Sequence, residues 1–372
     1  MSEGDGQRRV VIGCMTGTSI DGIDAALVEI HGRGLSMSAR CLALESRPLG
    51  NLATDLRKLA AQQPMSARRI TELAWELGEL HAEIAGVLAR NAGAAIDLVC
   101  VHGQTVYHGG GKTWQLIQPA PIAHRLRAPV VFDLRAADVA SGGQGAPITP
   151  IADWILFRSQ VDRVVINLGG FCNITWVPAH AGPEQVRGRD VCACNQILDG
   201  LARVRLGRKF DEGGEVALKG KVIPAAMEAM CQILREQGAQ RRSLGTGDEV
   251  VSGWISATAA QAGADVVRTA CEAVGIVVGE SIAHIAGSSF GAEVIVAGGG
   301  VRNRALLAAI ERSAGGRRVT VSDALGIQSA AREAMEFAVL GALCQDRTPI
   351  TLPKVTGCAD PAPLSGAWVF PG

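Results

Sequence analysis

Near its start the chain reads Cys14-Met15-Thr16-Gly17-Thr18-Ser19-Ile20-Asp21-Gly22-Ile23-Asp24, between an apolar run that ends at Gly13 and another that begins at Ala25. This order predicts a strand, a tight hydroxyl-rich turn and a second strand. Two glycines let the backbone approach a ligand, and successive turn amides form a concavity that suits a phosphate. The carboxylates of Asp21 and Asp24 would then hold Mg²⁺ or its waters. A plain hairpin corner accounts for these residues equally well, so the rest of the chain has to decide.

Length and composition favour a large α/β enzyme. The 372 residues suffice for two domains, 48% of them are hydrophobic, and Lys+Arg and Asp+Glu balance at 36 each. The balanced charge indicates no nucleic-acid partner. Residues 1–9 are polar, and no apolar run is long enough to span a membrane, so we expect a cytoplasmic protein without a membrane partner. The ten scattered cysteines predict buried thiols.

Apolar strand-like runs alternate with helical patterns along the chain, which is typical of α/β proteins. In the first half we expect strands at 9–14, 25–30, 36–46, 98–101 and 129–132, and a long helix over 66–91. In the second half we expect strands at 164–167, 174–177 and 293–297, and helices at 194–206, 222–237, 256–287, 306–313 and 329–345, with a loop at 315–325. Each half begins with a strand, a glycine turn and a strand, which indicates internal duplication with a boundary near 140–165.

Several short motifs lack the context that their chemistry needs. The run 109–113 resembles a phosphate-binding P-loop but has Val106 where that motif needs glycine, so we expect a hairpin tip there. The run 287–291 matches G-x-S-x-G formally, yet it leaves a helix and enters a strand, the reverse of a nucleophile elbow. The pair Cys192 and Cys194 is too closely spaced for a typical zinc site without further ligands.

Three glycine turns each follow an apolar strand: residues 17–19, Gly169-Gly170 and Gly298-Gly299-Gly300. Ligands of α/β sheets collect at such strand ends. No G-x-G-x-x-G opens a helix, so a dinucleotide site is not indicated. The set favours a nucleoside triphosphate held between two lobes. We therefore expect the two-lobed actin-like ATPase fold of sugar kinases, actin and heat-shock chaperones, with a central nucleotide cleft.

From about residue 10 to 371, the sequence resembles the anhydro-N-acetylmuramic acid kinase family. The family's M-S-G-T-S-x-D-G-x-D is matched by residues 15–24 with Thr16 in place of Ser, and its H-G-Q-T by residues 102–105. Further family motifs are matched by Asp133, Arg135, Asp138 and Gly142–Pro147; by Asn167, Gly169, Gly170 and Asn173; by Asp211, Gly214, Ala217, Gly220 and Val222; and by Gly298–Gly300, Asn303, Asp323, Gly326, Glu333, Ala334 and Val355–Gly357.

Two segments depart from the family pattern. The usual D-T-G-P-G-N is Asp190-Val191-Cys192-Ala193-Cys194-Asn195 here, and the usual K-S-T-G-R-E is reduced to fragments at 243–248. Both segments lie where the sugar is expected, so they permit a different sugar.

The resemblance implies an ATP- and Mg²⁺-dependent kinase that opens the 1,6-anhydro ring of anhydro-N-acetylmuramic acid with water and phosphorylates O6, in cell-wall recycling. It implies Asp190 as the catalytic base and Asp21 as the metal ligand. It assigns the nucleotide to Gly17, Thr18, Ser19, Ile20, Asp21, Gly22, Ile23, Asp24, Gly169, Gly170, Gly298, Gly299, Gly300 and Asn303. It assigns the sugar to His102, Gln104, Arg135, Gln144, Gly145, Ala146 and Pro147. The two lobes would be residues 1–160 and 161–372, the first with the first phosphate turn and part of the sugar site, and a homodimer is also implied.

Alternatives remain open at the level of sequence. The chain could be a kinase of the same fold for another sugar or anhydrosugar, or a regulator that binds nucleotide without catalysis. Asp190 could only cap a turn, His102 could be a core histidine, Arg135 could pair with Asp138, and Asp24 could only support its turn.

Overall fold

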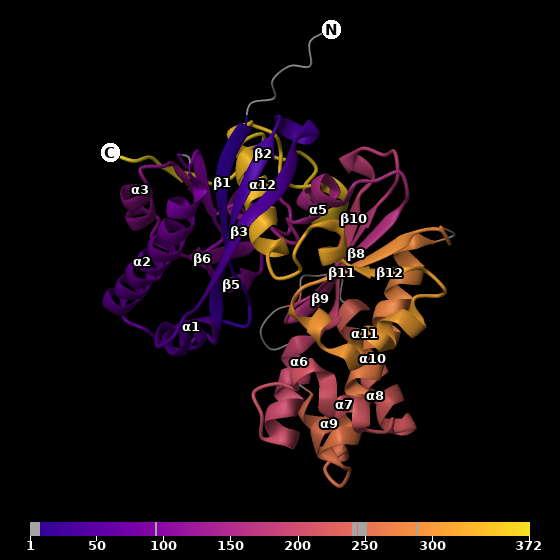
Figure 1. Cartoon of the computed structure of the whole chain (residues 1–372). Helices are drawn as coiled ribbons and strands as arrows, with labels where there is room; N and C mark the ends of the chain where they lie inside the picture. The colour runs from indigo at the N-terminus through magenta and orange to yellow at the C-terminus, as the bar shows by residue number, and fades with distance from the viewer. Residues whose placement is uncertain (1–7, 94, 240–243, 245–250, 288) are drawn as a thin grey trace. The chain divides into compact units, whose positions relative to one another are not determined.

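The computed structural model describes residues 8–93, 95–239, 244, 251–287 and 289–372. The chain forms two compact units. Unit 1 comprises Met1–Leu156 with Ala331–Gly372, and unit 2 comprises Phe157–Ala330. In Figure 1 the yellow C-terminal helix α12 lies beside the indigo strands of unit 1, although these segments are far apart in the sequence.

Unit 1 is built on a six-stranded sheet in the order β13-β7-β4-β1-β2-β3. The strands are β1 (Arg8–Thr16), β2 (Gly22–His31), β3 (Ser38–Pro48), β4 (Leu98–Val101), β7 (Val130–Phe132) and β13 (Ala367–Val369). The first three form an antiparallel meander, whereas β4 runs parallel to β1 and β7 parallel to β4. The fully buried run of β4 is typical of a parallel strand covered on both faces.

Two long helices pack on this sheet. Helix α2 (Ala67–Ala92) begins where the Ser66 hydroxyl accepts the amide of Arg69 and ends at Gly93 in the left-handed conformation. Helix α12 (Arg332–Gln345) packs against β1 at Gly13, where an added Cβ would lie 1.9 Å from the Ala334 carbonyl oxygen. The remaining elements of unit 1 are α1 (Leu52–Ala60), α3 (Ala120–Leu126), α4 (Ala136–Ala140), α5 (Pro150–Phe157), α13 (Pro353–Thr356) and the hairpin of β5 (Gln104–Gly109) and β6 (Lys112–Leu116).

Unit 2 repeats the same topology in a five-stranded sheet, in the order β10-β9-β8-β11-β12. The strands are β8 (Arg163–Leu168), β9 (Phe171–Val177), β10 (Arg187–Ala193), β11 (Glu293–Ala297) and β12 (Val319–Val321). Here too the first three strands are antiparallel, and β11 and β12 follow parallel to β8. The helices are α6 (Asn195–Leu201), α7 (Glu215–Lys219), α8 (Pro224–Ala239), α9 (Ser252–Ala257), α10 (Gly263–Ala286) and α11 (Arg304–Ser313).

The two sheets confirm the duplication inferred from the sequence. In each sheet, the first strand pairs antiparallel with the second strand on one side and parallel with a later strand on the other side. The boundary after Leu156 lies within the expected interval, but residues 331–372 pack in unit 1 and not with the second half. The expected helix at 256–287 is α10 over most of its length, but its first two residues belong to the separate helix α9, which begins at Ser252. The expected helix at 194–206 is α6 followed by a π-helical turn, Ala202–Leu206. The expected loop at 315–325 contains β12, and β10 was not expected at all.

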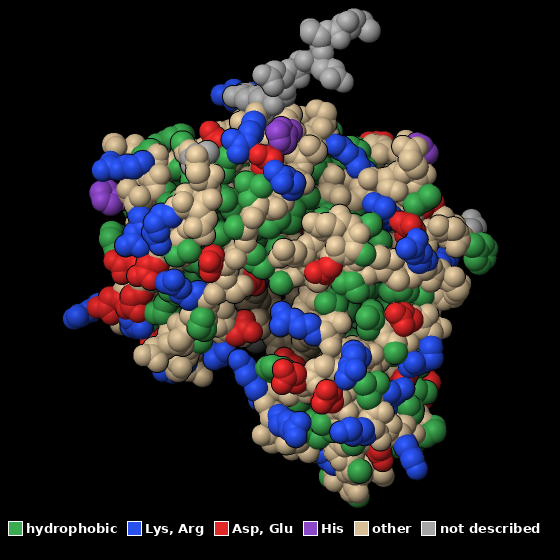
Figure 2. All heavy atoms as spheres, viewed as in Figure 1, with side chains coloured by type: hydrophobic (Ala, Val, Ile, Leu, Met, Phe, Trp, Pro, Cys, Tyr) green, Lys and Arg blue, Asp and Glu red, His purple; other side chains and the backbone are tan. Residues whose placement is uncertain are grey.

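Other expectations concern single features. The glycines at 109–111 form the tip of the β5–β6 hairpin, as predicted. All ten cysteines are free thiols, and all but Cys41 are buried. Among the described residues, no helix is long and apolar enough to span a bilayer. On the face shown in Figure 2, Lys and Arg side chains are interspersed with Asp and Glu side chains.

Candidate active site

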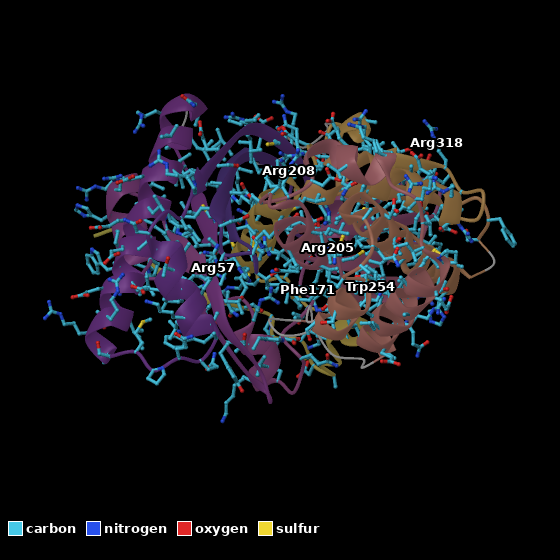
Figure 3. The ribbon with its side chains drawn as sticks, turned by 90° about the horizontal axis from the view of Figure 1, so that it is seen from below. Arg57, Phe171, Arg205, Arg208, Trp254 and Arg318 are labelled. Atoms are coloured by element: carbon cyan, nitrogen blue, oxygen red, sulfur yellow. The ribbon has the colours of Figure 1, made fainter. Side chains whose placement is uncertain are left out.

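The first glycine turn joins β1 to β2 and is held from its inner side. The Ile20 amide donates to the Gly17 carbonyl at 3.2 Å, and Ile20 has a φ of +51° with its side chain buried. Arg57 from α1, labelled in Figure 3, donates to the Ile20 carbonyl at 2.7 Å. These contacts leave the side chains of Thr18 and Ser19 exposed at the outer side of the turn. The turn thus has the donors that a phosphate needs at its accessible surface.

The two carboxylates of this turn differ in surroundings. Asp21 is exposed and accepts the Ser19 hydroxyl at 2.7 Å. Asp24 lies opposite Ser46 in the β2–β3 ladder and accepts its hydroxyl at 2.5 Å. The Ile23 side chain between them is fully buried. Asp21 is therefore the more available metal ligand, while Asp24 contributes to strand pairing.

His102 and Arg135 meet at the end of β4. The amide of His102 donates to the Cys14 carbonyl at 3.0 Å, which fixes its backbone to β1. Arg135 Nε donates to His102 Nε2 at 3.1 Å, and Arg135 Nη1 donates to the Gly145 carbonyl at 2.8 Å. Burial, followed by the charge of Arg135, lowers the pKa of His102 well below its ordinary value. His102 is therefore neutral and, because Nε2 accepts, it carries its proton on Nδ1.

Buried Asp138 organises the loop that contains the predicted sugar residues 144–147. Its Oδ2 accepts the amide of Gly145 at 2.7 Å, and its Oδ1 accepts the hydroxyl of Thr356 at 2.7 Å. Gly145 has a φ of +70°, and an added Cβ would lie 2.6 Å from Val139 Cγ2, so glycine is required there. The Gln144 side chain is exposed and Ala146 precedes a cis Pro147. Arg135 thus donates hydrogen bonds both to His102 and to this loop, and Asp138 fixes the loop by accepting the Gly145 amide.

Gln104 lies beside the first turn. It is fully buried, and its Nε2 donates to the Gly17 carbonyl at 3.3 Å and to the Thr105 carbonyl at 3.2 Å. Within unit 1 the structure therefore brings the phosphate turn and the predicted sugar residue Gln104 into direct contact.

In unit 2 the turn Gly169-Gly170 joins β8 to β9. Its carbonyls accept the amides of Cys194, Asn195 and Gln196 at 2.9–3.1 Å, so the turn is fixed to the start of α6. The Asn195 side chain adds a bond from Nδ2 to the Leu168 carbonyl at 2.9 Å.

The third glycine turn, Gly298–Gly300, follows β11 next to this one. Gly298 has a φ of +85°, and an added Cβ would lie 2.5 Å from Asn167 Oδ1. Asn303 caps α11, because its Oδ1 accepts the amide of Leu306 at 3.1 Å. Gly298 borders a pocket of about 340 Å³, lined by Gly298, Val301, Arg302, Val321, Asp323, Gln328, Ser329 and Ala330. The structure places Gly298 at this pocket, whereas Gly300 is buried and the Asn303 side chain serves as a helix cap.

Asp190 lies on the edge strand β10 opposite Asn173 of β9. Its Oδ2 accepts the amide of Leu244 at 2.8 Å. The rest of the altered loop, residues 243 and 245–248, lies outside the described residues. Among the described residues, no group of three or more His, Cys, Asp or Glu side chains could hold a metal ion.

The comparisons with known proteins match nearly the whole chain. The family model described as anhydro-N-acetylmuramic acid kinase matches residues 9–371. The chain belongs to this family. A protein named anhydro-N-acetylmuramic acid kinase from Gloeobacter violaceus is 33% identical over 380 residues, covering 95% of this chain and 97% of that protein. One of the same name from Salinibacter ruber is 34% identical over 389 residues, covering 98% and 97%.

Solved structures give more distant likenesses. An activator of 2-hydroxyisocaproyl-CoA dehydratase from Clostridium difficile with bound ADPNP is 14% identical with a TM-score of 0.46, covering 90% of this chain and 94% of that one. A ROK family glucokinase from Streptomyces griseus in complex with glucose and AMPPNP is 15% identical with a TM-score of 0.41, covering 89% and 99%. Both TM-scores are low, so these likenesses carry no functional conclusion. Family membership and the two matching sheets give the chain the actin-like ATPase fold.

Sequence reasoning missed the residues that support the site. Gln115 on β6 is buried and donates from Nε2 to the Thr113 hydroxyl at 2.8 Å, beside the HGQT segment. Gln237 on α8 is buried and accepts an amide of β10. A buried glutamine on a strand or helix gives no local signal, because only its distant partner explains it.

Proposed function

We propose that the chain is an ATP-dependent kinase that hydrolytically opens the 1,6-anhydro ring of anhydro-N-acetylmuramic acid and phosphorylates O6, as a step of cell-wall recycling. The observation that carries the proposal is the family match over residues 9–371. It is supported by the three glycine turns, each of which follows the first or the fourth strand of its sheet.

The residues present fit a nucleotide. The pocket of about 340 Å³ beside Gly298 falls within the usual range for ligand sites and carries both Arg302 and Asp323 on its wall. We assign the adenosine to this pocket and the phosphates to the turns at 17–21 and 169–170. A single exposed carboxylate, Asp21, suits Mg²⁺, which keeps several waters and takes its other ligands from phosphate oxygens.

The chemistry follows from these positions. Bound ATP with Mg²⁺ supplies the phosphoryl group for O6 and neutralises the charge that develops on it. The Asp190 carboxylate takes a proton from the water that attacks C1, while the C1–O6 bond breaks and O6 becomes the phosphoryl acceptor. Arg135 is charged and donates to the loop carbonyl of Gly145, so we assign it to the lactyl carboxylate of the sugar. Neutral His102 holds Arg135 in place without competing for the anion.

An assay of ADP release tests the proposal. Purified protein with ATP and Mg²⁺ is offered anhydro-N-acetylmuramic acid, the same sugar with an open ring, and other anhydrosugars. We expect ADP release with the first sugar only. ADP release with a different sugar, and none with anhydro-N-acetylmuramic acid, would overturn the proposed substrate. The altered segments 190–195 and 243–248 would then be adapted to that other sugar.

Substitution of Asp190 tests the assignment of the base. Asp190→Asn retains an oxygen that can accept from the Leu244 amide but removes the basic carboxylate, so kcat should fall by roughly a hundredfold or more. Nucleotide binding, measured by calorimetry, should be unchanged. Wild-type turnover by this variant would remove Asp190 from the mechanism.

A further inference from the structure

The strand that carries Asp190 is irregular immediately after it. In the β9–β10 ladder Asp190 pairs with Asn173 and Cys192 pairs with Cys172, so Val191 has no partner and forms a bulge. A bulge bends its strand and changes the direction of neighbouring side chains. The orientation of the Asp190 carboxylate therefore depends on what holds the bulge.

Two consecutive residues of helix α8 contact β10 at this bulge and just after it. Gln237 is 7% exposed, and its Oε1 accepts the buried amide of Ala193 at 2.9 Å. Gly238 lies against the bulge itself, because an added Cβ would be 2.6 Å from the Val191 carbonyl oxygen. Glycine is unfavourable within a helix, and this close approach accounts for its presence.

Helix α8 is itself fixed in unit 2. Its own residues Met230 and Leu234 are fully buried. Trp254 from α9, labelled in Figure 3, donates from Nε1 to the Ala226 carbonyl at 2.8 Å. These contacts fix the position of α8, and with it Gln237 and Gly238 near its C-terminal end.

We propose that Gln237 and Gly238 form a positioning pair that fixes the bulge after Asp190 and thereby aims its carboxylate at the attacking water. The inference rests on the proposed function, in which Asp190 is the base. Neither residue is assigned any contact with substrate, so both act through the backbone of β10. Without the Gln237 oxygen, the buried amide of Ala193 loses its acceptor, and the strand end shifts to find another.

Because a base must lie within hydrogen-bond reach of the proton it takes, a small shift lowers turnover more than binding. Gln237→Met keeps the length of the side chain and removes the acceptor oxygen. Gly238→Ala forces α8 away from Val191. For both variants we expect kcat to fall by roughly tenfold or more, with the KM values for sugar and ATP little changed.

Three further variants complete the design. Gln237→Glu retains an acceptor oxygen at the same reach and should recover most of the wild-type kcat. Gln232→Met makes the same change at an exposed position of α8, where the Gln232 side chain donates to Glu236 one turn later, and should leave kcat unchanged. Gln237→Asn is a milder change, because it only shortens the side chain and moves its oxygen away from the Ala193 amide. Its kcat provides the test if Gln237→Met or Gly238→Ala fails to fold.

The outcomes separate the two proposals. A wild-type protein that releases no ADP with anhydro-N-acetylmuramic acid overturns the proposed function. An active wild type together with folded Gln237→Met, Gly238→Ala or Gln237→Asn variants of unchanged kcat overturns the positioning role and leaves the function standing. A rise in KM with constant kcat also overturns the positioning role. So does a fall in kcat for Gln232→Met as large as that for Gln237→Met.

Discussion

His81 illustrates how burial alone sets the state of a titratable group. It lies on the inner face of α2, fully buried, with Nδ1 2.8 Å from the Leu77 carbonyl oxygen one turn earlier. Burial lowers its pKa from 6.5 to about 4, against the smaller opposite effect of that carbonyl. The folded protein therefore keeps His81 neutral at a pH where the unfolded chain binds a proton.

This difference makes stability depend on pH in a defined direction. Above pH 6.5 both states hold a neutral imidazole, and between 6.5 and about 4 only the unfolded state is protonated, so stability falls as the pH falls through that window. The full effect is about 3 kcal/mol. We expect His81→Leu to lose less stability than wild type from pH 7 to about pH 4.5, as measured by urea unfolding. Parallel pH profiles for the two proteins would contradict this.

Single residues also mark the limit of prediction within the site. Asp21 could be selected from the sequence because it stands in the glycine turn after β1, whereas His102 and Arg135 were selected through the family resemblance. The roles of Asp24 as a strand-pairing group and of Asn303 as a helix cap could not, because both depend on the final hydrogen-bond partner. Gln237 and its partner Ala193 are 44 residues apart in the sequence, with no pattern to connect them.

At the scale of elements, the contact between β1 and α12 defines the core of unit 1. Gly13 lies at the centre of β1, and an added Cβ would lie 1.9 Å from the Ala334 carbonyl oxygen and 2.4 Å from the Ala338 amide nitrogen. Both atoms are helix backbone, so they cannot rotate away as a side chain would. The helix can approach this closely only because position 13 has no side chain.

We therefore expect Gly13→Ala to lower the free energy of unfolding by about 3 kcal/mol, the upper range for overpacking a core. Chemical denaturation followed by circular dichroism measures it. Gly253→Ala is the matched control, since an added Cβ there meets nothing within 4 Å and position 253 lies in helix α9. A Gly13→Ala protein as stable as that control would show that α12 shifts at no cost.

Apolar strands could be predicted from the sequence, whereas the polar strand β10 and the break between α9 and α10 could not. The strands β1, β2, β4, β8 and β11 were recognised because their residues form continuous apolar runs. β10 was missed because it begins Arg187-Gly188-Arg189-Asp190, a polar composition that is tolerated at the edge of a sheet. The break between α9 and α10 was missed because apolar residues continue across it.

At the scale of the whole molecule, the chain leaves unit 1 once and returns once, after Leu156 and at Ala331. A buried ionic cluster lies beside both connections. Arg332 of α12 donates from Nη2 to Asp153 Oδ1 of α5 at 2.5 Å, and Nη2 lies 2.8 Å from Glu336 Oε1. All three side chains are at most 1% exposed. Burial raises the pKa of Glu336 well above its ordinary value, so Glu336 holds a proton more readily than an exposed glutamate does.

Breaking this cluster should destabilise the protein strongly. Asp153→Asn removes the carboxylate that accepts from the buried Arg332 guanidinium, at a cost of about 3–5 kcal/mol. The double variant Asp153→Leu with Arg332→Met removes both charges and should recover most of that loss. Thermal and urea unfolding of the two variants measure the difference. If Asp153→Asn is as stable as wild type, the cluster contributes nothing to joining α5 and α12.

The duplicated topology could be inferred from the repeated strand–turn–strand pattern, but the return of α12 to unit 1 could not. That return depends on the close fit of Gly13 with Ala334 and on the pairing of Asp153 with Arg332, whose partners are 179 residues apart. Long-range pairs of this kind leave no local periodicity.

The fate of the bridging oxygen tests the central claim most directly. Anhydro-N-acetylmuramic acid labelled with oxygen-18 in its 1,6-bridge is incubated with ATP, Mg²⁺ and the wild-type protein, and the products are followed by phosphorus NMR. We predict one ADP for each sugar phosphate, with the label in the C6–O–P ester, because water attacks C1 and the bridge oxygen remains on C6. A label at C1, or release of inorganic phosphate without any sugar phosphate, would contradict the account.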